Sequence, residues 1–343
     1  MLQRLKDKLR PFLPRNILGA WRERREWESA HSHIFSSKPA VVYVTWGPNR
    51  PGPDRYVIHD VMAGRPLILL YLFAWALQPE DIVTMSRHFR KTLKRHPKHR
   101  IVMLCNELFT VDLFRAQGVE AIFCNHNCFV NENYFSIDAN APKKYDAIYN
   151  AVMAPYKRHL LASKVESLAL ITYRFGGTYQ SEYELQVRAA LAHAAWLVDA
   201  HRDINKGSAS DVARFDNQSR VGLCLSAKEG AMFGSIEYLL CGLPVVTTRN
   251  AGGRDVFFDP EYTEFVDDDP EAVRKGVANL IARAPDAAYI RAKTIAKMEE
   301  HRQRLRDLLK DTVSHLEIPW EPGTHGPLTY RNLRDLGRRL NQL

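Results

Sequence analysis

Short apolar runs alternate with longer amphipathic segments along this chain. The run 40–46 (AVVYVTW) is β-branched and aromatic and ends at Gly47-Pro48, which is typical of a buried strand that leads into a loop. Similar runs lie at 67–73, 101–105 and 121–124, with helix-like segments at 79–96 and 107–117. Buried strands that alternate with helices predict a parallel α/β sheet.

A second series of the same kind begins near Lys143. Its strand candidates are 146–150, 169–173, 194–198, 221–225 and 244–247, and its helix candidates are 157–167, 181–192, 235–241 and 270–283. Two consecutive series predict two Rossmann-like α/β halves that face a central cleft, and that cleft is the expected ligand site.

The pattern divides the chain into four parts. A length of 343 residues agrees with two domains rather than one. In the N-terminal segment, leucines keep a helical spacing that Pro11 and Pro14 interrupt. The predicted parts are a basic N-terminal arm (1–36), a first Rossmann-like domain (37–140), a second Rossmann-like domain (141–290) and a C-terminal helical tail (291–343).

Composition excludes several classes of protein. Apolar residues make up 45% of the chain and charged residues 25%, which excludes disorder, collagen-like repeats and a coiled coil. The longest apolar run, 67–77, is far shorter than the roughly 20 residues of a membrane-spanning helix. The basic N-terminal segment lacks the apolar stretch of a secretory signal, and the five cysteines form no tight paired framework. We therefore expect a cytoplasmic protein.

The formal net charge of +9 is concentrated in three segments. Residues 1–25 carry eight basic and two acidic side chains, 84–100 carry seven basic and none acidic, and 331–343 carry four Arg and one Asp. These segments together carry +16, which leaves −7 for the rest of the chain. Such localised positive charge indicates a polyanionic partner.

The 84–100 segment places Arg87, Lys91, Lys94 and Lys98 on a different helical face from its apolar stripe. Phospholipid head groups or a phosphorylated acceptor fit this face better than nucleic acid, because no aromatic interleaving or nucleic-acid motif accompanies it. We therefore predict a peripheral position on the inner face of a membrane, with 1–25 and 84–100 as the contact segments and no nucleic acid as partner.

The densest chemistry lies between residues 221 and 258. A predicted buried strand ends near Ser226 and a turn with Gly230 follows, after which a helix directs its N-terminus at the edge of the sheet, an arrangement that suits a diphosphate. Glu229 and Glu237 stand eight positions apart, so one carboxylate can reach a sugar hydroxyl while the other chelates a ribose diol. A surface helix with solvated carboxylates is the alternative interpretation.

The order of these motifs resembles a known family. The E-x7-E pattern of Glu229 and Glu237, followed by CGLPVVTT and then Gly252-Gly253, is similar to the donor-binding half of the family-4 retaining glycosyltransferases, which have the GT-B fold. The resemblance covers roughly residues 143–283. That family also places a phosphate-binding Lys just before the first helix of this half, and in YDAIYNAVMAPYKRHLLA Lys157 takes that place.

The resemblance implies a role for each of these residues. Lys157 would hold the diphosphate, Glu237 the ribose hydroxyls and Glu229 the transferred sugar, whose pocket the N–H groups of Met232 and Phe233 would line. The implied donor-binding residues are Arg158, Gly230, Met232, Phe233, Glu237 and Gly253. Lys157 would otherwise be a surface lysine at a helix start, and Gly252-Gly253 a turn between a strand and a helix.

The chain departs from the family pattern at one point. The family usually has an Arg about six residues before the Lys, and Ala151 and Val152 occupy that region. Arg158, Arg254 or a residue of the first half are the candidates to replace it.

The first half offers His126, with Asn125 and Asn127, at the end of a predicted buried strand, where side chains face the cleft. Because the resembling enzymes often use a His or Asp of this half near the reacting sugar, we predict His126 as a third catalytic residue with Glu229 and Lys157. A structural histidine is the alternative. Cys124 and Cys128 have the spacing of half a zinc site without a second pair, so we predict no metal.

The resemblance implies a hexosyltransferase-type glycosyltransferase of cell-envelope glycan biosynthesis. It would move a sugar from a UDP- or GDP-linked donor, with anomeric retention and no cofactor, to a lipid-linked, polysaccharide or lipopolysaccharide acceptor. The first domain would bind the acceptor and the second the nucleotide sugar. The alternatives are an epimerase or phosphorylase on the same fold, or a non-catalytic module that binds a sugar nucleotide or a lipid.

Overall fold

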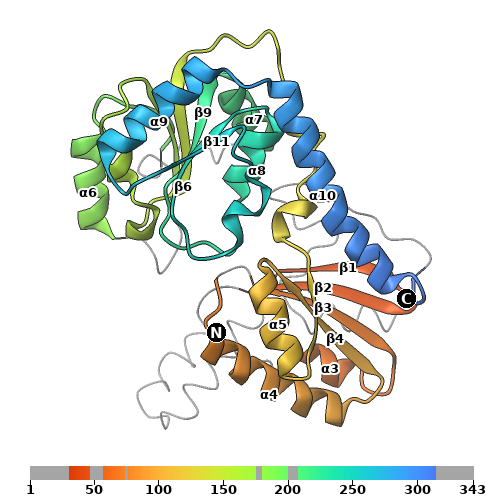
Figure 1. Cartoon of the computed structure of the whole chain (residues 1–343). Helices are drawn as coiled ribbons and strands as arrows, with labels where there is room; N and C mark the ends of the chain where they lie inside the picture. Colours follow the sequence, from red (N-terminus) through yellow and green to blue (C-terminus); the bar gives the residue numbers. More distant parts are fainter. Residues whose placement is uncertain (1–30, 47–56, 74–75, 175–179, 200–207, 314–343) are drawn as a thin grey trace, which may run out of the picture.

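Two sheets organise the molecule (Figure 1). The computed structural model describes residues 31–46, 57–73, 76–174, 180–199 and 208–313. The first sheet has the order β1-β2-β3-β4-β5, in which β1 is antiparallel to β2 and the other pairs are parallel. Its elements are β1 (His31–Ser37), β2 (Ala40–Trp46), α3 (Val57–Val61), β3 (Leu67–Phe73), α4 (Pro79–Arg95), β4 (His99–Cys105), α5 (Leu108–Ala116) and β5 (Glu120–Phe123).

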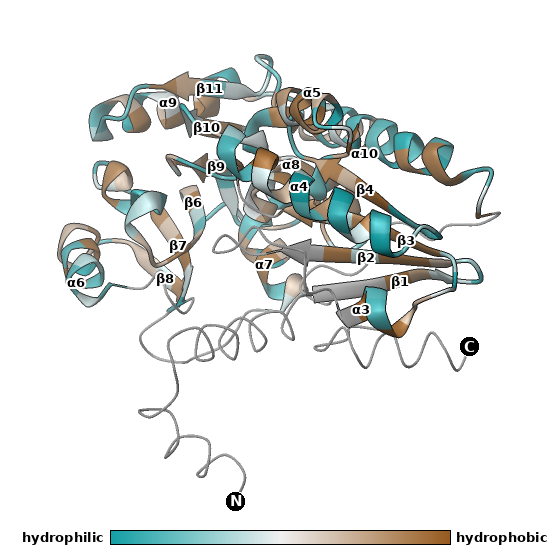
Figure 2. Ribbon diagram, turned by 90° about the horizontal axis from the view of Figure 1, so that it is seen from below, coloured by the Kyte–Doolittle hydropathy of each residue, from teal (hydrophilic) through white to brown (hydrophobic). Residues whose placement is uncertain are grey.

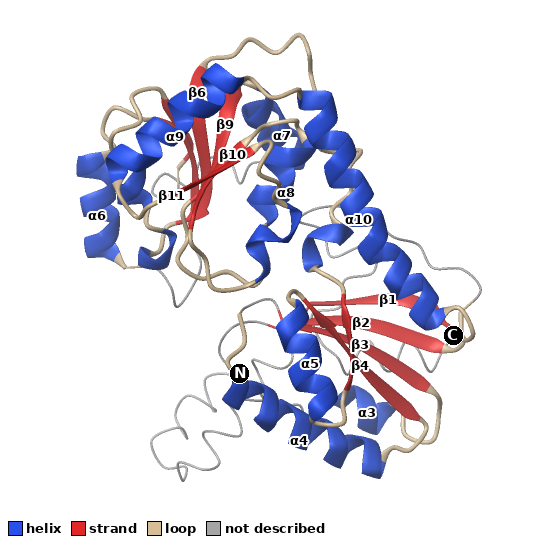
Figure 3. Cartoon of the chain, in the orientation of Figure 1, coloured by secondary structure: helices blue, strands red, loops and turns tan. Residues whose placement is uncertain are grey.

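The second sheet is parallel throughout and has the order β11-β10-β9-β6-β7-β8, with helices on both faces (Figure 3). Its strands are β6 (Tyr145–Val152), β7 (Leu168–Tyr173), β8 (Ala195–Val198), β9 (Ser219–Cys224), β10 (Val245–Thr248) and β11 (Thr263–Val266). Its helices are α6 (Ser181–Ala190), α7 (Ala209–Asn217), α8 (Phe233–Leu240) and α9 (Pro270–Arg283). The chain starts in the middle, runs out to β8 and returns to β9, so the direction of winding reverses between β6 and β9.

The central strands β2 and β3 bury both of their faces, because nearly all of their residues are apolar. On one face, Val42 and Leu69 pack with Ile58, Phe89 and other residues of α3, α4 and α5. On the opposite face, the intervening strand residues, such as Tyr43, join the core that continues into the second half. Figure 2 shows apolar residues concentrated on β3 and β4, whereas α4 and α10 present mixed surfaces. No helix in the described ranges has both the length and the apolarity to cross a membrane.

The last described helix, α10 (Ala287–Leu309), runs from the second sheet to the first (Figure 1). Arg302 is buried, donates from Nε to the carbonyl of Cys128 (2.7 Å) and forms an ion pair with Glu132 (2.7 Å). The ring of His301 lies edge-on against Phe123 at 4.6 Å between centroids. The predicted C-terminal helical tail (291–343) is helical as far as Leu309 and contacts the first half, while 314–343 lie outside the described residues.

The prediction of two Rossmann-like α/β halves is confirmed, and several elements differ from the sequence-based expectation. β1 begins at His31, inside the predicted basic arm, whose residues 1–30 lie outside the described ranges. The predicted helix 157–167 is instead two 3-10 turns, η3 (Pro155–Lys157) and η4 (His159–Ala162), because Arg158 between them adopts the left-handed conformation (φ 54°). Strand β11 and helix α7 were not predicted.

Candidate functional site

The candidate site lies where the carboxyl ends of β6 and β9 emerge side by side, at the reversal of winding in the second sheet. β6 leads into η3, which ends at Lys157, and β9 leads into the turn that holds Glu229 and Gly230 before α8 begins at Phe233. The backbone N–H of Ala227 donates to the carbonyl of Tyr156 (3.0 Å), so the two loops are joined. Crevices at such a reversal are where ligands bind in open parallel sheets.

Lys157 and Glu229 form a buried ion pair at this edge. The Lys157 ammonium contacts Oε1 of Glu229 directly, and the two residues are only 6% and 5% exposed. Tyr149 donates its hydroxyl to the Lys157 carbonyl, and the Tyr156 ring lies 5.4 Å from the ammonium, so backbone and side chain are both held. The structure thus brings together the two residues predicted to hold diphosphate and sugar, and pairs them with each other.

Glu237 is on α8 and faces β6. Its Oε2 accepts a hydrogen bond from Nδ2 of Asn150 (3.2 Å), and the Tyr238 hydroxyl accepts one from the Asn150 backbone N–H (2.6 Å). Burial raises the pKa of Glu237 to about 7, and the Asn150 amide offsets this only in part. The partner of Glu237 in this structure is therefore a neutral amide.

The two arginines proposed to replace the missing Arg are bound to protein groups. Arg158 donates from Nε to the Leu225 carbonyl (2.6 Å) and from its guanidinium to Thr248 Oγ1 (2.6 Å). Arg254 is fully buried and donates to the Ser226 carbonyl (2.8 Å) and to the side chain of Thr247. Both side chains hold the ends of β9 and β10 together, and a phosphate on Arg158 would have to compete with these acceptors.

Gly252 and Gly253 allow three backbone segments to meet. Gly252 has a φ of 127°, and a Cβ there would lie 1.7 Å from the carbonyl oxygen of Glu229. A Cβ on Gly253 would lie 2.4 Å from the Asn106 carbonyl oxygen of the first half. The glycines therefore permit the close packing of the two halves, and the donor contact predicted for Gly253 stays a prediction.

Asn125, His126 and Asn127 connect the first half to this same region. Nδ2 of Asn125 donates to the Gly253 carbonyl (2.8 Å), and Nδ2 of Asn127 donates to the Met232 carbonyl (3.1 Å) at the start of α8. The ring of His126 is 4.7 Å from that of Phe233, in an edge-on arrangement. His126 thus borders the residues predicted to line the sugar pocket, as an inter-domain contact, and its catalytic role stays a prediction.

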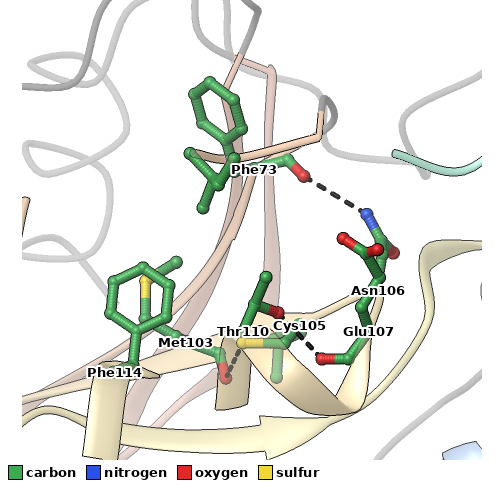
Figure 4. Close-up of a pocket in the computed structure, with 9 residues that line it drawn as sticks. Phe73, Met103, Cys105, Asn106, Glu107, Thr110 and Phe114 are labelled. Atoms are coloured by element: carbon green, nitrogen blue, oxygen red, sulfur yellow. Dashed lines mark hydrogen bonds between the residues drawn. The ribbon is translucent and has the colours of Figure 1, made fainter. Parts of the chain in front are cut away.

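A small pocket, partly open to solvent, lies at the carboxyl ends of β3 and β4 (Figure 4). Its lining residues are Phe73, Leu77, Met103, Leu104, Cys105, Asn106, Glu107, Thr110 and Phe114. Burial raises the pKa of Glu107, and the charge of Lys228, from the turn that holds Glu229, lowers it. Asn106 and Glu107 were not predicted from the sequence, although two polar residues directly after the buried run 101–105 were an available signal.

No protein-family model and no curated protein sequence matches this chain. Solved structures do resemble it. HepE of Anabaena in complex with UDP is 15% identical in sequence, with a TM-score of 0.54 over 78% of each chain. HepE in complex with UDP and glucose is 11% identical, with a TM-score of 0.52 over 81% of this chain and 100% of that one. Sucrose-phosphate synthase from Thermosynechococcus elongatus is 14% identical, with a TM-score of 0.53 over 71% of this chain and 68% of that one. The predicted GT-B fold is thereby confirmed.

The raised pKa of Glu237 predicts a pH dependence of stability. The folded chain keeps a proton on this carboxyl up to about pH 7, whereas the unfolded chain releases it near 4.5. The free energy of unfolding should therefore fall as the pH rises between these values, by up to about 3 kcal/mol. Urea unfolding of the wild type and of Glu237→Gln at pH 5 and pH 8 measures this, since the variant lacks the titrating group.

Glu182→Gln, at an exposed position on α6, is the control and should keep the wild-type pH dependence. If the wild type and Glu237→Gln lose the same free energy of unfolding between the two pH values, the raised pKa is contradicted.

Proposed function

We propose that this chain is a glycosyltransferase that moves a sugar from a UDP- or GDP-linked donor to an acceptor with retention at the anomeric carbon. The observation that carries the proposal is the convergence of Lys157, Glu229 and Glu237 at the ends of β6 and β9 and on α8. The GT-B fold supports it, and so does the HepE structure that holds UDP and glucose.

In this proposal, donor binding rearranges the buried ion pair. The diphosphate carries more negative charge than one carboxylate, so it attracts the Lys157 ammonium and releases Glu229 to accept a hydrogen bond from a sugar hydroxyl. Glu237 in its ionised form accepts from both ribose hydroxyls. Gly230 and the N–H groups of Met232 and Phe233 line the space for the sugar.

The chemical step then depends on leaving-group stabilisation. As the bond to the diphosphate breaks, positive charge develops on the sugar and negative charge on the leaving oxygens, which Lys157 is placed to stabilise. The acceptor hydroxyl attacks on the face that the diphosphate leaves, and its proton passes to a diphosphate oxygen. His126, beside Phe233, borders the reacting sugar. The proposal needs no metal and no resident cofactor.

The acceptor side is proposed for the first half. The pocket at β3 and β4, with Glu107 near Lys228, supports an acceptor site that adjoins the turn of Glu229. Arg87, Lys91 and Lys94 are exposed on α4, which supports contact with an anionic membrane surface. Together these features fit a lipid-linked or envelope-glycan acceptor at the inner face of a membrane, with residues 1–25 and Lys98 adding to the contact.

The donor assignment can be tested with two glutamate variants. Glu237→Ala should weaken the binding of UDP or GDP by about 10- to 100-fold, because a charged hydrogen bond to the ribose is lost. Glu229→Gln should bind the same diphosphates at least as tightly as the wild type, because Lys157 is no longer neutralised, and its turnover of the sugar donor should fall by about tenfold or more. Calorimetric titration and a transfer assay measure both.

Glu182→Gln, outside the site, is the control for both glutamates and should leave binding and turnover unchanged. Wild-type behaviour of both Glu229→Gln and Glu237→Ala would remove the basis of the donor assignment.

The proposed reaction predicts the activity that remains after metal removal and the anomeric configuration of the product. Because Lys157 supplies the charge that stabilises the diphosphate, transfer activity should survive an excess of EDTA. Proton NMR of the fresh product should show the anomeric configuration of the donor. Activity that EDTA abolishes and Mg²⁺ restores would contradict the metal-free site, and an inverted product would contradict retention.

Membrane contact is testable by reversing charge on α4. The wild type should co-sediment with anionic vesicles at low salt and dissociate at high salt, since each basic residue near such a surface contributes about 1 kcal/mol. The combined variant Arg87→Glu, Lys91→Glu and Lys94→Glu should lose most of this binding, whereas Lys275→Glu, exposed on α9, should not. Wild-type protein that stays in the supernatant at low salt would rule out the membrane contact.

A further inference from the structure

Tyr173 is an exposed aromatic residue at the edge of the candidate site. It is the last residue of β7 and is 48% exposed, although the five residues before it in the strand are buried. It pairs in register with Val152, the last residue of β6, and its carbonyl accepts from the backbone N–H of Met153 (2.8 Å). The backbone that carries the ring is therefore fixed to the loop that leads to Lys157.

The ring is open to solvent and still lies among protein groups of the site. Burial raises the pKa of the Tyr173 hydroxyl, and the charges of Glu229 and Glu237 raise it further. Tyr173 pairs with Val152, two residues after Asn150 on β6, so its side chain lies on the same face of the sheet as that of Asn150. Both carboxylates act on one hydroxyl, so Tyr173 shares an environment with the two residues proposed to bind sugar and ribose.

The strand order sets the direction in which a nucleotide would extend. Asn150 on β6 holds Glu237, and β7 is the next strand outward, about 5 Å away. The first half contacts the opposite side of the site, at the start of α8 and at Gly253. With the ribose at Glu237 and the transferred sugar toward the first half, the remaining part of the donor, its base, extends toward the end of β7.

We infer that the ring of Tyr173 is the surface on which the nucleobase of the donor stacks. The inference rests on the proposed function and adds to it a residue that recognises the base. Stacking on an aromatic face tolerates any base, because every base has a π-face, so the ring accepts uracil and guanine alike. Tyr173 acts in binding and touches no reacting atom.

The experiment is a calorimetric titration of the full chain with three probes: UDP, GDP and ribose 5-diphosphate, which lacks a base. Tyr173→Ala and Tyr173→Leu should bind UDP and GDP between about 5- and 150-fold more weakly than the wild type. Both should bind ribose 5-diphosphate as the wild type does. Tyr173→Phe keeps the ring and should stay within about twofold of the wild type for all three probes.

Tyr289→Ala is the matched control, because Tyr289 is 37% exposed on α10, outside this edge of the sheet. It should bind all three probes as the wild type does, and far-ultraviolet circular dichroism should show every variant folded. The Leu variant keeps most of the apolar volume, so it reports on the ring even if the Ala variant folds poorly.

Two outcomes would overturn the inference alone. One is unchanged binding of UDP and GDP by the folded Leu variant, and the other is an equal loss for ribose 5-diphosphate, which would place the contact on the ribose or the phosphates. A wild-type chain that binds neither UDP nor GDP would contradict the proposed function itself, and the inference would fall with it.

Discussion

The buried ion pair between Lys157 and Glu229 is the interaction on which the candidate site depends. Removing two charges from water is costly, and each is tolerable here only because the other lies against it. The pair joins the loops after β6 and β9, and the two side chains together carry no net charge. In the proposed reaction, a ligand that separates the pair must itself offer negative charge to Lys157 and a hydrogen-bond donor to Glu229. A nucleotide sugar offers both.

In the described part of the chain, the carboxyl group of Glu237 is held by a neutral residue and not by a cation. Asn150 holds Glu237 by an amide, and burial without a nearby cation keeps the pKa of that carboxyl at about 7. Arg158 and Arg254 hold the ends of β9 and β10 together. Ionised Glu237 and a diphosphate are therefore stabilised by few fixed cations, which places most of the proposed electrostatic role on Lys157.

The two halves meet through backbone contacts that need small residues and amides. Gly253 lets the second half approach the Asn106 carbonyl, and Asn125 and Asn127 bridge to Gly253 and to the start of α8. Helix α10 adds Arg302, which satisfies acceptors around Cys128 in the first half. The same contacts set the position of the pocket at β3 and β4 relative to Glu229, and in the proposed reaction they would fix how the acceptor meets the donor.

Local sequence determined the elements whose burial is uniform or periodic. The runs 40–46 and 67–73 are apolar on both faces and were predicted as buried strands, and Asp269-Pro270 marks the start of α9. The spacing of Glu229 and Glu237 likewise placed both carboxylates around one turn. The tertiary structure decided the polar edge strand β1, the 3-10 turn that carries Lys157, and the hydrogen bonds that Asn150 and Asn125 donate to Glu237 and Gly253. The physical reason is that periodicity reports how one segment is buried, whereas a side chain's partner depends on contacts between segments far apart in the chain.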